Sequence, residues 1–282
     1  MISSRPSWLR AKAPSGEEYK ELVKLVEDKN LHTVCQSANC PNIGECWKER
    51  TATFMILGGS CTRDCRFCAV EHGNLLSVDE DEPRRVAEAV QYLKLKHAVV
   101  TSVTRDDLAD GGAFIFAETI RLIHQNVPGC SVEVLIPDLQ GDKEALRVIL
   151  DAKPEILNHN VETAERLYLQ VRPQAIYNRS LQLLKRAKEY GQGAKVKSGL
   201  MVGLGETWDE LVRTITDIKN TGCDILTVGQ YLSPSKNHHK VDKYYTPEEF
   251  DNINSIAMDM GFSFVESAPL VRSSYHAAKH KA

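Results

Sequence analysis

Apolar residues recur along this chain in two alternating patterns. Short runs rich in β-branched residues are followed by longer stretches in which an apolar residue returns every three or four positions. The first pattern is typical of buried strands and the second of amphipathic helices. We expect strands at 53–57, 98–103, 131–136, 155–160, 195–202 and 224–232, with a shorter terminal run at 262–266.

Helices are expected between these strands, at 84–96, 113–126, 143–152, 163–170, 180–190, 208–220 and 247–260. Pro83 suits a first helical turn after the acidic run 79–82, and Gly222 suits the end of the helix 208–220. Strict alternation of strand and helix predicts parallel βα units, arranged either as an open doubly wound sheet or as a barrel.

The chain before residue 53 has a different character. Residues 17–28 have helical periodicity behind the candidate cap Ser15, whereas Pro41 and Gly44 oppose a regular helix between 35 and 46. No long linker, repeat or low-complexity tract divides the chain. We therefore expect an N-terminal extension (1–50), one α/β body (51–268) and a C-terminal tail (269–282).

The composition narrows the class of protein. The 282 residues are 42 % hydrophobic and 26 % charged, with a formal net charge of −3, so no general affinity for nucleic acid is implied. No apolar run approaches the roughly 18–20 residues of a membrane-spanning helix, and residues 1–8 do not resemble a secretory signal. We expect a cytoplasmic protein, or an organelle protein without its leader, and neither a membrane nor a nucleic-acid partner.

Six of the eight cysteines lie between residues 35 and 68. Cys61, Cys65 and Cys68 follow the first predicted strand with the spacing C-x3-C-x2-C. Three thiolates can hold three corners of a 4Fe–4S cluster and leave the fourth iron open, and an open position is typical of a reactive metal site. A zinc loop that takes a ligand from elsewhere is the alternative, although zinc motifs favour paired C-x2-C halves.

Cys35, Cys40 and Cys46 form a second group with the spacing C-x4-C-x5-C, which fits no common zinc finger. We favour a second three-thiol cluster, but the six cysteines could also share one zinc or cluster site. Cys130 and Cys223 stand alone beside predicted strands and are expected to be buried apolar residues.

Polar or glycine residues follow five of the predicted strands. Since α/β barrels place their sites at the carboxyl ends of the strands, we expect these residues to line one rim. Alone, Asp106 could be a turn carboxylate and Asn160 a helix cap. The group comprises the 61–68 loop, Ser102, Asp106, Asn160, Glu162, Gly203, Glu206, Gln230 and Tyr231.

The C-x3-C-x2-C loop behind the first strand of a series of βα units resembles the radical S-adenosylmethionine superfamily. The cysteines at 35, 40 and 46 and the near-terminal Arg272-Ser-Ser-Tyr275 narrow the resemblance to the lipoyl synthase family. Further agreement is found at 8–10, 101–112, 158–160, 171–173, 197–206 and 229–231. The resemblance implies a partial (β/α)6 TIM-like barrel with the N-terminal extension and the C-terminal tail attached.

It also implies two 4Fe–4S clusters. Cys61, Cys65 and Cys68 would hold the cluster whose open iron binds S-adenosylmethionine and cleaves it to methionine and a 5′-deoxyadenosyl radical. Cys35, Cys40 and Cys46 would hold an auxiliary cluster, completed by Ser274 or alternatively by Ser273. Without the resemblance, these serines are expected to lie in a flexible polar tail.

The S-adenosylmethionine contacts implied by the resemblance are less specific. Glycine would let the backbone approach the cofactor, and Arg172 could pair with a carboxylate as a fork. The candidates are Ser102, Asp106, Asn160, Glu162, Arg172, Gly203 and Glu206.

The reaction implied is radical insertion of two sulfur atoms at C6 and C8 of a protein-bound octanoyl-lysine, with the auxiliary cluster as sulfur donor. Partners would be octanoylated lipoyl-domain proteins (E2 subunits of 2-oxoacid dehydrogenases and the glycine cleavage H protein), a flavodoxin- or ferredoxin-type reductant, and an iron–sulfur carrier. The alternative enzyme is another radical sulfur-inserting or methylthiolating one, which leaves the 272–275 motif unexplained. A non-catalytic RNA-binding module is suggested only by the basic stretches 236–240 and 279–281.

Overall fold

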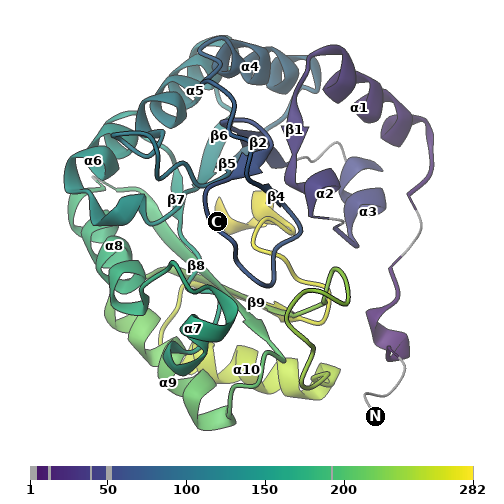
Figure 1. Ribbon diagram of the computed structural model, residues 1–282, viewed down its shortest axis with the longest axis vertical. Helices are drawn as coiled ribbons and strands as arrows, with labels where there is room; N and C mark the ends of the chain where they lie inside the picture. The colour runs from purple at the N-terminus through teal and green to yellow at the C-terminus, as the bar shows by residue number, and fades with distance from the viewer. Residues whose placement is uncertain (1–4, 12–13, 39, 49–52, 192, 282) are drawn as a thin grey trace.

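A single curved sheet with helices on its outer face dominates the computed structural model, which describes residues 5–11, 14–38, 40–48, 53–191 and 193–281 (Figure 1). Its strand order is β1-β2-β5-β6-β7-β8-β9-β10. The strands are β1 (His32–Thr33), β2 (Thr53–Ile56), β5 (His97–Ser102), β6 (Ser131–Leu135), β7 (Ile156–Asn158), β8 (Lys195–Val202), β9 (Ile225–Gln230) and β10 (Phe264–Ala268). Two short strands, β3 (Ser60–Cys61) and β4 (Glu71–His72), pair separately.

Six longer helices that follow β2 cover the convex side of this sheet (Figure 1). They are α4 (Glu82–Tyr92), α5 (Ala113–Asn126), α6 (Lys143–Asp151), α8 (Tyr177–Tyr190), α9 (Trp208–Asn220) and α10 (Pro247–Asp259). The described chain also has α1 (Glu17–Asp28), α2 (Val34–Ser37) and α3 (Ile43–Lys48) before β2, and the short α7 (Tyr168–Val171) before α8. Short 3-10 turns occur at η1 (Ser7–Leu9), η2 (Leu139–Gly141), η3 (Glu165–Leu167) and η4 (Ala277–Lys281).

Local sequence explains why these elements begin where they do. Thr207 and Thr246 open α9 and α10 with capping boxes, in which the threonine and the glutamate three residues later satisfy each other's backbone N–H groups. Strands β2 and β9 are buried at every position, as expected for parallel strands covered on both faces.

The predicted parallel α/β fold is confirmed. From β2 to β10 each strand pairs with its neighbour in parallel, whereas β1 is antiparallel to β2. Among the described strands, no pairing joins β1 to β10, and these strands form an open arc (Figure 1). The N-terminal segment runs past the open side, where the Trp8 indole donates to the carbonyl of Tyr245 at 3.2 Å (Figure 1).

The prediction of an irregular loop at 35–46 is wrong in part. Cys35 lies in α2 and Cys46 in α3, with Cys40 between them, and Gly44 is inside α3. A helical glycine costs about 1 kcal/mol, and here it is offset because α3 buries Trp47 completely against Tyr19 of α1, with ring centroids 5.2 Å apart.

Two predicted helices also differ from the observed ones. The helix expected at 84–96 begins at Glu82 and ends at Tyr92, because Lys94 adopts a left-handed φ of 53° that breaks the helix. The range 163–170 forms η3 and the four-residue α7 instead of one helix. None of the described helices combines the length and apolarity that crossing a bilayer requires.

Candidate functional site

The first cysteine loop leaves the sheet at the carboxyl end of β2. Leu57 and Gly58 both have positive φ, 69° and 86°, and turn the chain sharply. The Glu82 carboxylate fixes this turn by accepting the Leu57 N–H at 2.6 Å. Beyond it, the Cys61 sulfur accepts backbone N–H groups from Arg63 at 3.4 Å and Thr104 at 3.3 Å. The loop is therefore attached to the residues that follow β5.

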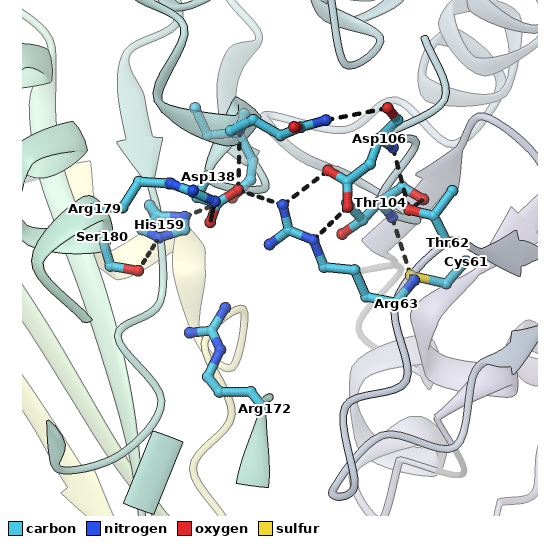
Figure 2. Close-up of polar contacts among 12 residues, drawn as sticks. Cys61, Thr62, Arg63, Thr104, Asp106, Asp138, His159, Arg172, Arg179 and Ser180 are labelled. Atoms are coloured by element: carbon cyan, nitrogen blue, oxygen red, sulfur yellow. Dashed lines mark hydrogen bonds and ion pairs between the residues drawn. The ribbon is translucent and has the colours of Figure 1, made fainter. Parts of the chain in front are cut away.

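Arg63 anchors the same loop to the rim. Its guanidinium donates to both carboxylate oxygens of Asp106, at 2.6 and 2.8 Å, and to Asp138 at 2.6 Å (Figure 2). Burial alone would raise the pKa of Asp138, but Arg63 lowers it to about 2 through hydrogen bonds and charge. Arg63 and Asp138 are both buried. The loop therefore has a rigid ionic support.

Sequence reasoning missed this support. Arg63 lies inside the cysteine motif but is not one of its thiols, and Asp138 follows β6, whose carboxyl end contributes no residue to the group expected to line the rim. The pair Pro137-Asp138 directly after a predicted strand was the available signal.

The cysteines of this loop are partly buried. Burial raises the pKa of Cys65 to about 11 and that of Cys68 to about 12, so both are protonated at neutral pH until a metal displaces the proton. Over the described residues, no three His, Cys, Asp or Glu side chains are grouped so as to hold one metal ion. In a cuboidal cluster each thiolate binds a different iron, so the three sulfurs need not converge on one point.

Three of the predicted cofactor contacts carry unpaired polar atoms. Ser102 Oγ, Asn160 Oδ1 and Arg172 Nε are buried without a hydrogen-bond partner. Ser102 is the last residue of β5, Asn160 lies just after β7 and Arg172 just after α7, near the rim that carries the cysteine loop. Because buried polar atoms are nearly always paired, these atoms suit a polar ligand bound beside the loop. The side chains present therefore fit a bound cofactor.

Glu162 belongs to the same group and has an unusual backbone. Its φ of 71° is rare for a side chain of this kind, and its carboxylate accepts the Asn160 amide at 3.1 Å. Burial raises the pKa of Glu162. Strained backbone of this type gathers at functional sites. Nearby Gly199 has no room for a side chain, since a Cβ there would lie 2.7 Å from Asn160 Oδ1.

The other predicted contacts are engaged by the protein itself. Asp106 is paired with Arg63, and Glu206 accepts the N–H groups of Gly203 and Leu204 at 2.6 and 2.9 Å. A Cβ on Gly203 would lie 2.3 Å from the Gln230 side chain, so packing against Gln230 requires the glycine. These residues shape the rim, and a role in binding stays a prediction for each.

The second cysteine group meets the C-terminal tail. Ser274 Oγ accepts a hydrogen bond from the Thr53 hydroxyl at 2.8 Å. Burial raises the pKa of Cys35, and a hydrogen bond from the Thr53 backbone opposes that rise. Asn42 donates to the Leu270 carbonyl at 2.7 Å, and the Tyr275 hydroxyl lies 3.2 Å from Glu45. The segment 35–46 and the tail 270–275 thus form one assembly.

A glycine in the sheet makes room for this tail. A Cβ on Gly229 would lie 2.0 Å from the carbonyl oxygen of Val271, so only glycine is tolerated where the tail crosses β9. Arg272 then donates to the Gln230 carbonyl at 3.2 Å. These contacts bring Ser274 to the cysteine group from more than 220 residues away in the sequence.

Comparisons with known proteins identify the family. A model described as "Radical SAM superfamily" matches residues 55–218. The chain is 57 % identical to a lipoyl synthase of Rubrobacter xylanophilus over 97 % of this chain and 85 % of that protein. This chain belongs to the lipoyl synthase family. It is also 61 % identical to the lipoyl synthase of Koribacter versatilis, over 97 % of this chain and 90 % of that protein.

Solved structures agree on the fold. Methylornithine synthase aligns with a TM-score of 0.58 at 12 % identity, over 92 % of this chain and 80 % of that one. The hydrogenase maturase HydG aligns with a TM-score of 0.58 at 17 % identity, over 88 % and 68 %. The predicted family and enzyme class are confirmed, and S-adenosylmethionine and 4Fe–4S clusters are the cofactors of such enzymes.

Proposed function

We propose that the protein inserts two sulfur atoms, at C6 and C8, into an octanoyl group attached to a lysine of a lipoyl-domain protein. The observation that carries this proposal is the contact of the tail 270–275 with the cysteine segment 35–46 at Asn42 and Glu45, beside the hydrogen bond of Ser274 with Thr53. A radical enzyme that only generates the 5′-deoxyadenosyl radical has no need of a second thiol group completed by a distant serine.

Each thiol group has its own role in this proposal. Cys61, Cys65 and Cys68 hold the cluster that binds S-adenosylmethionine, which supplies a carbon radical able to break unactivated C–H bonds. Cys35, Cys40, Cys46 and Ser274 hold the auxiliary cluster, the sulfur donor. A hard oxygen such as that of Ser274 matches iron less well than a thiolate does and leaves more readily.

The remaining residues bind and orient. Ser102, Asn160 and Arg172 offer their unpaired polar atoms to S-adenosylmethionine, with Glu162 beside them. Arg63 keeps the cysteine loop in place through Asp106 and Asp138. Preorganised side chains of this kind position a cofactor without moving during the reaction.

The organisation and partners complete the proposal. Residues 1–50 carry the auxiliary cysteines, 51–268 form the partial barrel, and 269–282 form the tail with the Arg272–Tyr275 motif. The open side of the barrel admits the carrier lysine, and a flavodoxin- or ferredoxin-type protein supplies electrons. E2 subunits or the glycine cleavage H protein serve as carriers, and an iron–sulfur carrier rebuilds the auxiliary cluster.

Metal analysis and a product assay test this function. After reconstitution we expect about eight irons per chain and no stoichiometric zinc. With octanoylated carrier, S-adenosylmethionine and a reductant, we expect 5′-deoxyadenosine together with lipoyl carrier by mass spectrometry. Tightly bound zinc would contradict the proposal. Formation of 5′-deoxyadenosine without a thiolated carrier would favour the alternative radical enzyme.

A further inference from the structure

Beyond Ser274 the tail turns into the interior of the barrel. His276 has a left-handed φ of 52°, which reverses the chain direction before η4. The C-terminal end of the chain lies inside the arc of strands (Figure 1). Ala277 and His280 are buried there, with exposed fractions of 0 % and 1 %. This burial fixes the part of the tail that follows Ser274.

A chain of buried polar contacts holds this end of the tail. The Glu266 carboxylate of β10 lies 2.8 Å from His276 Nδ1 and 3.1 Å from His280 Nε2. The ammonium group of Lys197 on β8 lies 3.0 Å from His280 Nδ1 and 2.7 Å from Glu133 on β6. With neutral rings, His280 donates from Nε2 to Glu266 and accepts from Lys197 at Nδ1.

The energetics favour this arrangement as a rigid anchor. Glu133 and Lys197 are completely buried, and buried charges persist only when they are paired and hydrogen-bonded. The His280 ring also packs on Phe264, with centroids 4.7 Å apart. Three strands of the sheet therefore determine where His280 lies.

Ser274 lies between two fixed points of the chain. On one side, Leu270 is bound by Asn42 and Val271 crosses Gly229. On the other side, His276 is held by Glu266 only two residues away. A serine hydroxyl adds little binding of its own, so the protein must supply its position. Loss of a residue that orients a metal ligand typically costs about 10–100-fold in affinity or activity.

We propose that Glu266 and His280 are positioning residues that hold Ser274 against the Cys35–Cys46 segment. This inference rests on the proposed function, because it takes Ser274 as a ligand of the auxiliary cluster. It assigns the interior end of the tail a role in sulfur insertion and none in the cleavage of S-adenosylmethionine.

The test uses the variants Glu266→Gln and His280→Phe in the full chain. Glutamine keeps the size of Glu266 but cannot accept from both imidazoles, and phenylalanine keeps the packing on Phe264 but loses both hydrogen bonds. We expect lipoyl product to fall about tenfold or more in each variant, while 5′-deoxyadenosine formation changes less than about twofold. In chains that also lack Cys61, Cys65 and Cys68, the Mössbauer spectrum of the auxiliary cluster should change.

His124→Gln is the matched control, because the His124 ring on α5 pairs with Glu155 at 3.3 Å and neither side chain takes part in the contacts among Glu266, His276, His280 and Lys197. We expect it to leave product, spectrum and 5′-deoxyadenosine formation unchanged. The inference is overturned if Glu266→Gln and His280→Phe keep the wild-type spectrum and product yield, or if both products fall together as for a folding defect. Absence of lipoyl product from the wild-type chain would instead refute the proposed function, independently of the anchor.

Discussion

The two cysteine groups of this protein are assembled in different ways. Cys61, Cys65 and Cys68 lie on one short loop, and residues just beyond neighbouring strands support that loop. Cys35, Cys40 and Cys46 lie on and between two short helices, and the tail from the other end of the chain covers them. The first site is local to the rim, whereas the second requires both ends of the chain to meet.

The contacts that touch the two sites directly also differ. The first loop is held by a buried ion pair between Arg63 and Asp138 and a partly buried one between Arg63 and Asp106. The second is covered by single hydrogen bonds at Asn42, Thr53 and Tyr275, each contributing about 0.5–1.5 kcal/mol. A cluster that is consumed as sulfur donor must be dismantled and rebuilt, and weaker individual contacts suit that requirement.

The largest effects are expected when one thiol is removed from each site in turn, which tests whether the two sites act independently. We expect Cys65→Ala to reduce 5′-deoxyadenosine formation more than about a hundredfold, because even the loss of a residue behind a metal ligand costs about 10–100-fold. Cys40→Ala should retain 5′-deoxyadenosine formation and lose lipoyl product. Chromatographic assay of both products decides the matter, and loss of both in Cys40→Ala would show that the sites are not independent.

A substitution at Ser274 tests whether sulfur insertion can be lost while cleavage of S-adenosylmethionine is kept. Ser274→Cys replaces the proposed oxygen ligand by a thiolate, which iron holds more firmly. We expect normal 5′-deoxyadenosine formation and a loss of lipoyl product of about tenfold or more. Ser273→Cys is the matched control, because the Thr53 contact involves Ser274. A stronger loss in Ser273→Cys would transfer the ligand role to that residue.

Much of the barrel could be predicted, because its signals are local. Parallel strands buried on both faces appear as continuous apolar runs, and β8 lies at the predicted residues Lys195–Val202. The cysteine spacings are equally local. In contrast, the helix α3 was not predicted, because Gly44 favours an irregular loop. The packing of Trp47 on Tyr19 that compensates for this glycine joins residues 28 positions apart, and no local pattern reveals it.

Long-range pairings account for what the sequence could not predict. The partners of Arg63 lie 43 and 75 residues away in the sequence. Ser274 bonds Thr53 on β2, and His280 bonds Lys197 on β8, both far away along the chain. No local propensity encodes such contacts. The resemblance located the serine, but not the anchor formed by Glu266 and His280.

The smallest expected effect is on the stability of the protein and concerns the support of the first cysteine loop by Arg63. Arg63→Met should destabilise the protein before cluster loading by about 3–5 kcal/mol, because it leaves the buried Asp138 carboxylate without its main partner. We expect the Tm in differential scanning calorimetry to fall by roughly 10 °C. Arg84→Met is the control, since Arg84 pairs with Asp81 on the surface and such pairs contribute at most about 1 kcal/mol.

The pH dependence of the same variant tests the cause. Arg63 lowers the pKa of Asp138 from 3.8 to about 2 in the folded protein, so the ionised carboxylate stabilises the fold above about pH 4. That contribution is lost as the pH falls from about 4 to about 2. In Arg63→Met, burial without Arg63 raises the pKa, so the difference in Tm from the wild type should narrow as the pH falls from 4 to 2. An unchanged difference over that range would mean that Arg63 supports the cysteine loop through packing and not through charge.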